Sequence, residues 1–248
     1  MGKKKAEQGA AVKQDADTID RLFVDNAIAT VNGVGLSGEI TELSEADQIS
    51  GLRFNGYIGK ISTPRPSGAE DTVVFAFEPG AVSMPDKKAV EAAGVLNVFT
   101  VGSRLLISGK MQTLKDFETG KVLVFVLADF VGLSPAAALQ NDVVITGKLA
   151  KKPIARTTQR GKHITDIMLT TQNMLTAGSS YIPCICWGDT ADEAANWDKG
   201  DTVSILGRCQ SREYSKLTED GRREIRTAYE VSVRRARWVS LTDRKGKE

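Results

Sequence analysis

The chain has 248 residues, 41% hydrophobic and 26% charged, with a formal net charge of +2. This composition is ordinary for a soluble globular protein, and the length suits two domains that each bury a core. No run of about 18 apolar residues occurs, so we expect no membrane-spanning helix and no membrane partner. Residues 1–25 are polar and lack the apolar stretch of a secretory signal. We therefore expect a disordered tail there and a cytoplasmic protein.

An internal repeat divides the chain into two similar parts. Three pairs of segments match, by residue number 32–40 with 141–149, 73–77 with 182–186, and 102–112 with 200–210. The repeat predicts a first domain over residues 26–135, a linker over 136–140 and a second domain over 141–239. A short tail, residues 240–248, follows.

Within each copy, short segments alternate apolar and polar residues with a period of two and are separated by Gly, Asn, Asp and Pro. This pattern indicates antiparallel strands, and we count five per copy. A helical stretch falls between the third and fourth strands, over residues 86–93 in the first copy and 190–197 in the second. The predicted fold is all-β, with two tandem OB-fold barrels of five strands in Greek-key order. A sandwich would need about seven strands per domain.

Aromatic and basic side chains share the outer face of the second predicted barrel. Because residues two apart on a strand share a face, the outward set on its third and fourth strands is Tyr181, Ile185, Trp187, Arg208, Arg212 and Tyr214. Flat rings stack on any base, and guanidinium groups pair with phosphates. Strand propensity alone also favours aromatic residues, but their grouping with arginines on one face favours nucleic-acid binding.

The first copy lacks this outer surface. Thr72 and Glu78 occupy the positions of Tyr181 and Trp187, with Val74 and Ala76 outward between them. Residues 26–135 carry 9 basic and 12 acidic side chains, whereas residues 141–239 carry 16 basic and 12 acidic ones. Attraction for phosphate should therefore concentrate on the second barrel. We expect the first barrel to be mainly structural, supplying a dimer or inter-barrel interface.

Other chemistry finds little support in the sequence. Residues 33–38 fit the GxGxxG pattern of dinucleotide sites but lie within a predicted strand and precede no helix. His163 is the sole histidine, so neither a catalytic triad nor a four-ligand metal site can be assembled. The three cysteines, Cys184, Cys186 and Cys209, alternate with apolar residues and are expected to be reduced core thiols. We expect no enzyme, no metal and no cofactor.

The second copy resembles the bacterial single-stranded DNA-binding protein family. Segments 141–156, 181–193, 199–214 and 220–231 follow the family pattern in order. The resemblance implies sequence-independent binding and protection of single-stranded DNA in replication, recombination or repair. It assigns base stacking to Tyr181, Trp187 and Tyr214, and phosphate contacts to Arg156 and Arg212. Other basic residues that could extend the track are Lys148, Lys151, Lys162, Arg208 and Arg222.

The chain departs from the family pattern at two places. The loop over residues 172–180 lacks the stacking aromatic usual there, so the footprint should be smaller. Residues 242–248 are basic, where family members usually carry an acidic tail with a hydrophobic tip. We therefore expect a specialised or accessory role and not a housekeeping one. We expect a homodimer presenting four barrels. Two alternatives stay open, an interaction or assembly module on the same fold and binding of RNA.

Overall fold

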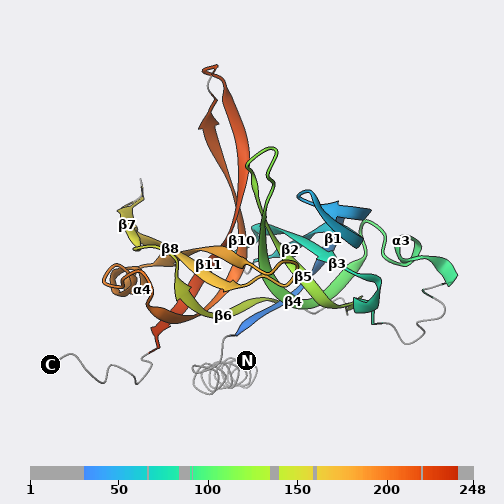
Figure 1. Ribbon diagram of the computed structural model, residues 1–248, viewed down its shortest axis with the longest axis horizontal. Helices are drawn as coiled ribbons and strands as arrows, with labels where there is room; N and C mark the ends of the chain where they lie inside the picture. The colour runs from blue at the N-terminus through green and yellow to red at the C-terminus, as the bar shows by residue number, and fades with distance from the viewer. Residues whose placement is uncertain are drawn as a thin grey trace, which may run out of the picture.

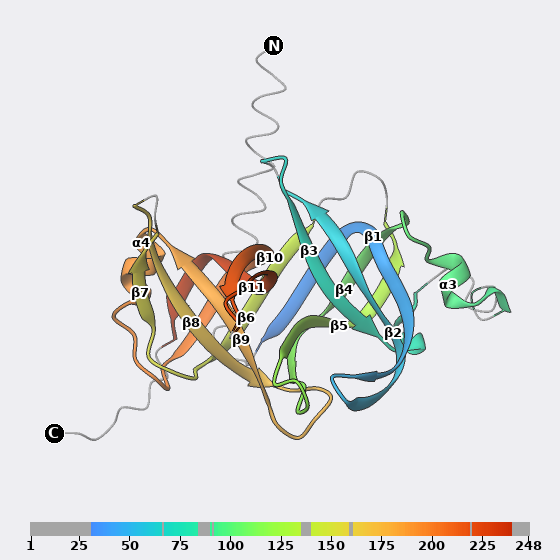
Figure 2. The same ribbon diagram turned by 90° about the horizontal axis from the view of Figure 1, so that it is seen from above.

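A computed structural model describes residues 31–65, 67–83, 90, 92–134, 140–158, 161–218 and 220–239 (Figure 1). The predicted tails, all of the linker except Gln140, and most of the predicted helix over 86–93 lie outside these ranges. Two barrels stand side by side, as Figure 2 shows from above.

The first barrel contains five strands that close on themselves. In chain order the elements are β1 (Asn32–Ile49), β2 (Leu52–Pro64), β3 (Glu70–Phe77), η1 (Pro79–Ala81), α3 (Val95–Val98), β4 (Arg104–Lys115) and β5 (Val122–Leu133). Strand β1 pairs with both β2 and β4, β2 pairs with β3, and β5 pairs with β3 and β4. This closed order is that of the predicted OB-fold.

The second barrel repeats this order and adds a strand. Its elements are β6 (Asn141–Leu149), β7 (Ile154–Thr157), β8 (His163–Gln172), β9 (Ser179–Trp187), α4 (Asp189–Ala194), β10 (Thr202–Leu217) and β11 (Arg223–Trp238). The predicted helix is confirmed within 190–197, and Trp197 after it is buried in the core. The count of five strands missed β7, which pairs with β8 and exposes all four of its residues. With no buried residue, β7 has no alternation to detect.

A single joint makes the two barrels one continuous sheet. Strands β1 and β6 pair antiparallel, from Asn32 opposite Ile145 to Leu36 opposite Asn141. The two ends of the joint are alike. Asn32 exchanges two hydrogen bonds with the backbone of Met111, at 2.8 and 2.9 Å, and Asn141 does the same with Cys209 at 2.9 and 2.8 Å. The barrels are therefore related by an approximate twofold axis through the joint.

The main hydrophobic core runs through both barrels without a break. The three cysteines are unpaired and buried within the second barrel, as predicted. Burial raises the pKa of the Cys186 thiol to about 12, and it raises the pKa of Cys184 and Cys209 as well. Thiols in such surroundings stay protonated and unreactive near neutral pH.

A second hydrophobic cluster covers the outer face of β3. Val74 and Ala76 point away from the barrel interior, as predicted, yet both are buried. Phe54 from the β1–β2 hairpin joins them, with Leu114 and Phe125 from β4 and β5. The face that corresponds to the predicted binding face of the second barrel is thus covered, by the first barrel's own hairpins together with Leu175 and Tyr229 of the second barrel.

Two hairpins project from the same side of the joint. Figure 1 shows the long β10–β11 hairpin rising above the barrels, with the shorter β4–β5 hairpin beside it. Strands β10 and β11 stay paired out to Leu217 and Arg223. Among the described residues, no helix is long and apolar enough to cross a membrane.

Candidate nucleic-acid interface

The register of the second barrel brings several predicted residues onto one outer face. Strand β8 places Thr170 opposite Tyr181 and Ile164 opposite Trp187, and β7 places Arg156 opposite Ile164. Residues opposite each other in neighbouring strands share a face. Tyr181 is 53% exposed. Trp187 is half-buried, and its Nε1 donates a hydrogen bond to Ser232 Oγ at 3.2 Å. Less of its ring is therefore open to a base than of the Tyr181 ring.

Ile185 points out of the barrel on the same face, as predicted, but it is buried there, with only 3% of its surface exposed. Its neighbours in the sheet are Asp166 on β8 and Ser232 on β11. In the middle of the sheet, side chains from both adjoining strands close over an aliphatic residue. Ile185 supports the face without forming its surface.

Arg156 is held by a carboxylate on the neighbouring strand. Its Nε and Nη2 donate to the two oxygens of Asp166 at 2.6 and 3.1 Å, a bidentate pair that fixes the plane of the guanidinium. The hydrogen bond with Asp166 raises the pKa of Arg156. The side chain remains nearly half exposed. Arg156 is thus an oriented, permanently charged group at the edge of the face.

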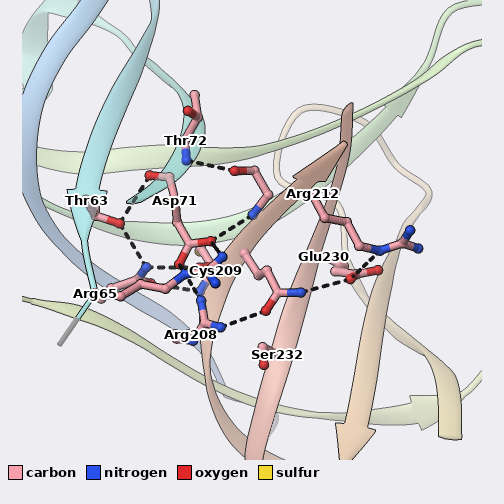
Figure 3. Close-up of polar contacts among 12 residues, drawn as sticks. Thr63, Arg65, Asp71, Thr72, Arg208, Cys209, Arg212, Glu230 and Ser232 are labelled. Atoms are coloured by element: carbon pink, nitrogen blue, oxygen red, sulfur yellow. Dashed lines mark hydrogen bonds and ion pairs between the residues drawn. The ribbon is translucent and has the colours of Figure 1, made fainter. Parts of the chain in front are cut away.

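A second oriented arginine lies where β10 leaves the barrel. Arg212 donates from Nε to Glu230 Oε1 at 2.9 Å, and Gln210 donates to the same oxygen at 3.2 Å (Figure 3). The Arg212 guanidinium carbon lies 5.8 Å from the centre of the Tyr214 ring, within the range of a cation–π contact. Tyr214 is 39% exposed. Arg212 and Tyr214 therefore offer a charge and a ring face side by side.

Arg208, also predicted to contact DNA, is engaged in the inter-barrel interface instead. Asp71 of the first barrel is fully buried and accepts from Arg208, from Arg65 Nε at 2.7 Å and from the Ser211 backbone N–H at 3.1 Å (Figure 3). Arg208 also donates to Gln210 Oε1 at 2.7 Å. Burial lowers the pKa of Arg208, partly offset by Asp71. These contacts give Arg208 a role in joining the barrels, so we leave it out of the candidate interface.

The other basic residues predicted to extend the track are three lysines and one arginine, and they come from different strands and loops. Lys148 is exposed and stands in one row with Thr170 and Tyr181. Lys151 follows β6 and Lys162 precedes β8, both exposed. Arg222 lies at the end of the β10–β11 hairpin, paired with Asp220 at 3.1 Å. Arg222 is four residues, roughly 13 Å along the strand, from Arg226, which lies opposite Tyr214.

Sequence reasoning missed three groups. The carboxylates of Asp166 and Glu230 orient the two arginines, and only the strand register could have shown it. Trp238, the last residue of β11, is 43% exposed. Its position near the end of a predicted strand gave no signal of exposure.

Two closed barrels with a helix between the third and fourth strands define a tandem OB-fold protein. Residues 140–238 match the model of the single-strand binding protein family. Single-stranded DNA-binding protein B of Bacillus subtilis is 31% identical over 80 residues, which are 30% of this chain and 71% of that protein. The chain therefore belongs to the single-strand binding protein family.

Other relatives match over part of their length. Single-stranded DNA-binding protein 2 of Listeria innocua is 32% identical over 91 residues, 34% of this chain, and the chain spans 56% of that protein. The wild-type single-stranded DNA binding protein of Thermus aquaticus has a TM-score of 0.62 at 17% identity, over 88% of this chain and 97% of that one. A deletion mutant of the same Thermus aquaticus protein has a TM-score of 0.61 at 18% identity, over 88% of this chain and 98% of that one. These two structures share the fold across both barrels.

Proposed function

We propose that the protein binds single-stranded DNA without sequence preference, chiefly through the outer face of the second barrel. The observation that carries the proposal is one exposed face that combines Tyr181, Trp187 and Tyr214 with the oriented guanidinium groups of Arg156 and Arg212. The family match falls on the same barrel. Relatives that match the chain carry the name single-stranded DNA-binding protein.

Each part of the face suits a different part of the strand. Tyr181 and Tyr214 expose ring surface on which an unpaired base can stack, whatever its identity. Glu230 binds Arg212 through Nε, and Figure 3 shows the end of the guanidinium directed away from that carboxylate. A phosphate oxygen can then accept from the outer N–H groups, in a charge-assisted hydrogen bond. A duplex keeps its bases stacked inside, so rings on this face favour single strands.

The carboxylates also limit the electrostatic share of binding. Asp166 and Glu230 partly neutralise Arg156 and Arg212, and the second barrel has an excess of only four basic side chains by sequence. Affinity should therefore fall with added salt, because counterions are released on binding, but with a modest slope. Base stacking on the exposed rings should supply the rest of the binding free energy.

For the first barrel we propose a structural role. Its corresponding face is covered by its own hairpins and by residues of the second barrel, and its buried Asp71 pairs with Arg208 of the second barrel. Its sequence carries more acidic than basic side chains, which repels phosphate. We further propose binding without catalysis, a cytoplasmic location, and a homodimer that presents four barrels and protects strands during replication, recombination or repair.

Titration with oligo-dT at low and at high salt tests the function. Trp187 lies on the proposed face, so stacking should quench its fluorescence strongly at low salt and less at high salt. The double variant Arg212→Ala, Tyr214→Ala should bind at least about tenfold more weakly. Arg53→Ala, an exposed arginine of the first barrel, is the matched control and should bind like the parent.

Two outcomes would redirect the proposal. Absence of binding by the unaltered protein at low salt would refute it and favour an assembly module on the same fold. Tighter binding of oligo-U than of oligo-dT would assign the face to RNA, since stacking alone does not distinguish the sugars.

A further inference from the structure

Exposed hydrophobic side chains gather on the two hairpins that project from the joint. In the described part of the chain, twelve large hydrophobic side chains are exposed, and five belong to these hairpins: Phe117, Val122, Tyr214, Leu217 and Ile225. Phe117 is the most exposed of all, at 90%. It lies in the turn of the β4–β5 hairpin, so it belongs to the first barrel, whose own outer face is covered.

A hydrogen-bonded turn presents Phe117 to solvent. The Asp116 carboxylate accepts from the backbone N–H groups of Glu118 and Thr119 at 3.0 and 2.8 Å. The Asp116 backbone bonds with Lys121 and with Gly120, each at 2.8 Å. Asx turns of this kind hold their backbone locally, without help from the core. The backbone that carries the ring is thus held in place although no core residue covers Phe117, which reduces the backbone entropy lost when the ring stacks on a ligand.

The hairpin leaves its barrel next to the proposed binding face. Thr113 on β4 donates from its backbone N–H to Ser180 Oγ at 3.1 Å and accepts at Oγ1 from the Tyr181 backbone N–H at 2.9 Å. From Thr113 the strand runs past Lys115 to the turn, and Phe117 lies roughly 13 Å along the chain from this contact. The surface that begins at Tyr181 therefore continues onto the β4–β5 hairpin.

The charges next to Phe117 balance one another. Lys115 ends β4 and Lys121 directly precedes β5, while the acidic Asp116 and Glu118 lie between them. The turn therefore carries no net charge, so a contact with the strand here would depend on the ring of Phe117 and not on attraction for phosphate.

We propose that Phe117 is an additional base-stacking point, by which the first barrel extends the path of the single strand beyond the second barrel. The proposal rests on the proposed function of the second barrel. A benzyl ring offers no hydrogen bond, so the contact would be indifferent to base identity and would add affinity only for strands long enough to reach it.

The test compares two lengths of oligo-dT against variants of Phe117. An oligomer of about 8 nucleotides suits one barrel, and one of about 30 covers both. Phe117→Ala and Phe117→Leu should bind the long oligomer about fivefold or more weakly than the parent and the short oligomer equally well. Phe117→Trp should retain affinity, because the aromatic face is restored. Val101→Ala, another exposed hydrophobic residue of the first barrel, is the control and should bind both lengths normally.

The outcomes distinguish this proposal from the proposed binding of single strands by the second barrel. Equal affinity of Phe117→Ala and parent for the long oligomer would overturn it while leaving the second barrel's function intact. Failure of the parent to bind either oligomer would overturn the function as well. If Phe117→Leu behaved like the parent, or if Phe117→Ala changed only self-association in sedimentation, the residue would be a protein contact and not a stacking point.

Discussion

Removing the charge of Asp71 should destabilise the joint between the barrels more than any change of a surface charge. Asp71 is fully buried and accepts hydrogen bonds from Arg65 and Arg208, whose side chains are 25% and 24% exposed. The change Asp71→Asn keeps the shape and can still accept from the Ser211 backbone N–H. It leaves two largely buried guanidinium groups without their counter-charge.

The expected cost follows from that burial. Removing one partner of a buried ion pair costs about 3–5 kcal/mol, and the partial exposure of both arginines favours the lower end, about 3 kcal/mol. For a chain of this size the melting temperature should fall by about 6–12 °C, measured by calorimetry at equal protein concentration. Asp129→Asn is the control. Asp129 is 59% exposed and pairs with Lys110 at 3.4 Å, so its loss should cost less than about 1 kcal/mol.

A double-mutant cycle makes the reasoning refutable. Arg208→Gln alone should also destabilise, and the double variant should cost less than the sum by about 1–3 kcal/mol, because the two groups interact directly. If Asp71→Asn lay within about 1 kcal/mol of the parent, or if the two changes were additive, the ion pair would contribute no net stability to the joint.

The remaining predictions concern binding, packing and titration. Arg212→Ala removes one phosphate contact and should reduce, by about 0.7, the slope of the logarithm of the oligo-dT binding constant against the logarithm of the salt concentration. Tyr214→Ala should weaken binding by about 1–3 kcal/mol and leave this slope unchanged. Equal slopes for the two variants would contradict these roles. Gly38→Ala places a Cβ 2.1 Å from the Ser62 carbonyl oxygen and should lower the free energy of unfolding, measured in urea, by about 1–3 kcal/mol. Gly33→Ala on the same strand is the control, because its Cβ meets nothing within 4 Å and should leave the free energy of unfolding unchanged. The raised pKa of the buried thiols, about 12 for Cys186, means that the unfolded chain loses these protons first. Stability should therefore fall as pH rises from about 9 toward 12, and a Cys→Ala triple variant should show a shallower fall.

The strands and their repetition could be predicted because alternation is a local property of the sequence. Phe75 and Phe77, like Cys184 and Cys186, follow the period of two and lie buried as expected. The same local reasoning failed for β7, whose four exposed residues show no alternation. It failed for the exposure of Val74 and Ala76, because their cover comes from hairpins that are distant along the chain.

The site residues show the same limit. The alternation on β9 and β10 placed Tyr181 and Tyr214 on the surface, where the structure has them. It also placed Arg208 outward, which is true of the second barrel by itself. The partner of Arg208 is 137 residues away in the other barrel. No pattern within one repeat reveals a contact between repeats, and the orientation of Arg212 by Glu230 depends likewise on the register of two strands.

The pairing of β1 with β6 within one chain has a consequence for how the two halves can differ. A joint between separate identical barrels would need a sufficient protein concentration, and every substitution would occur on both sides of the axis. Here the partners are tethered, so the joint persists at any dilution. At one end the Thr113 N–H donates to the hydroxyl of Ser180, and at the corresponding place the Ser211 N–H donates to the carboxylate of Asp71. An acidic group that would bury two negative charges in a symmetric dimer is thus present only once, where arginines neutralise it.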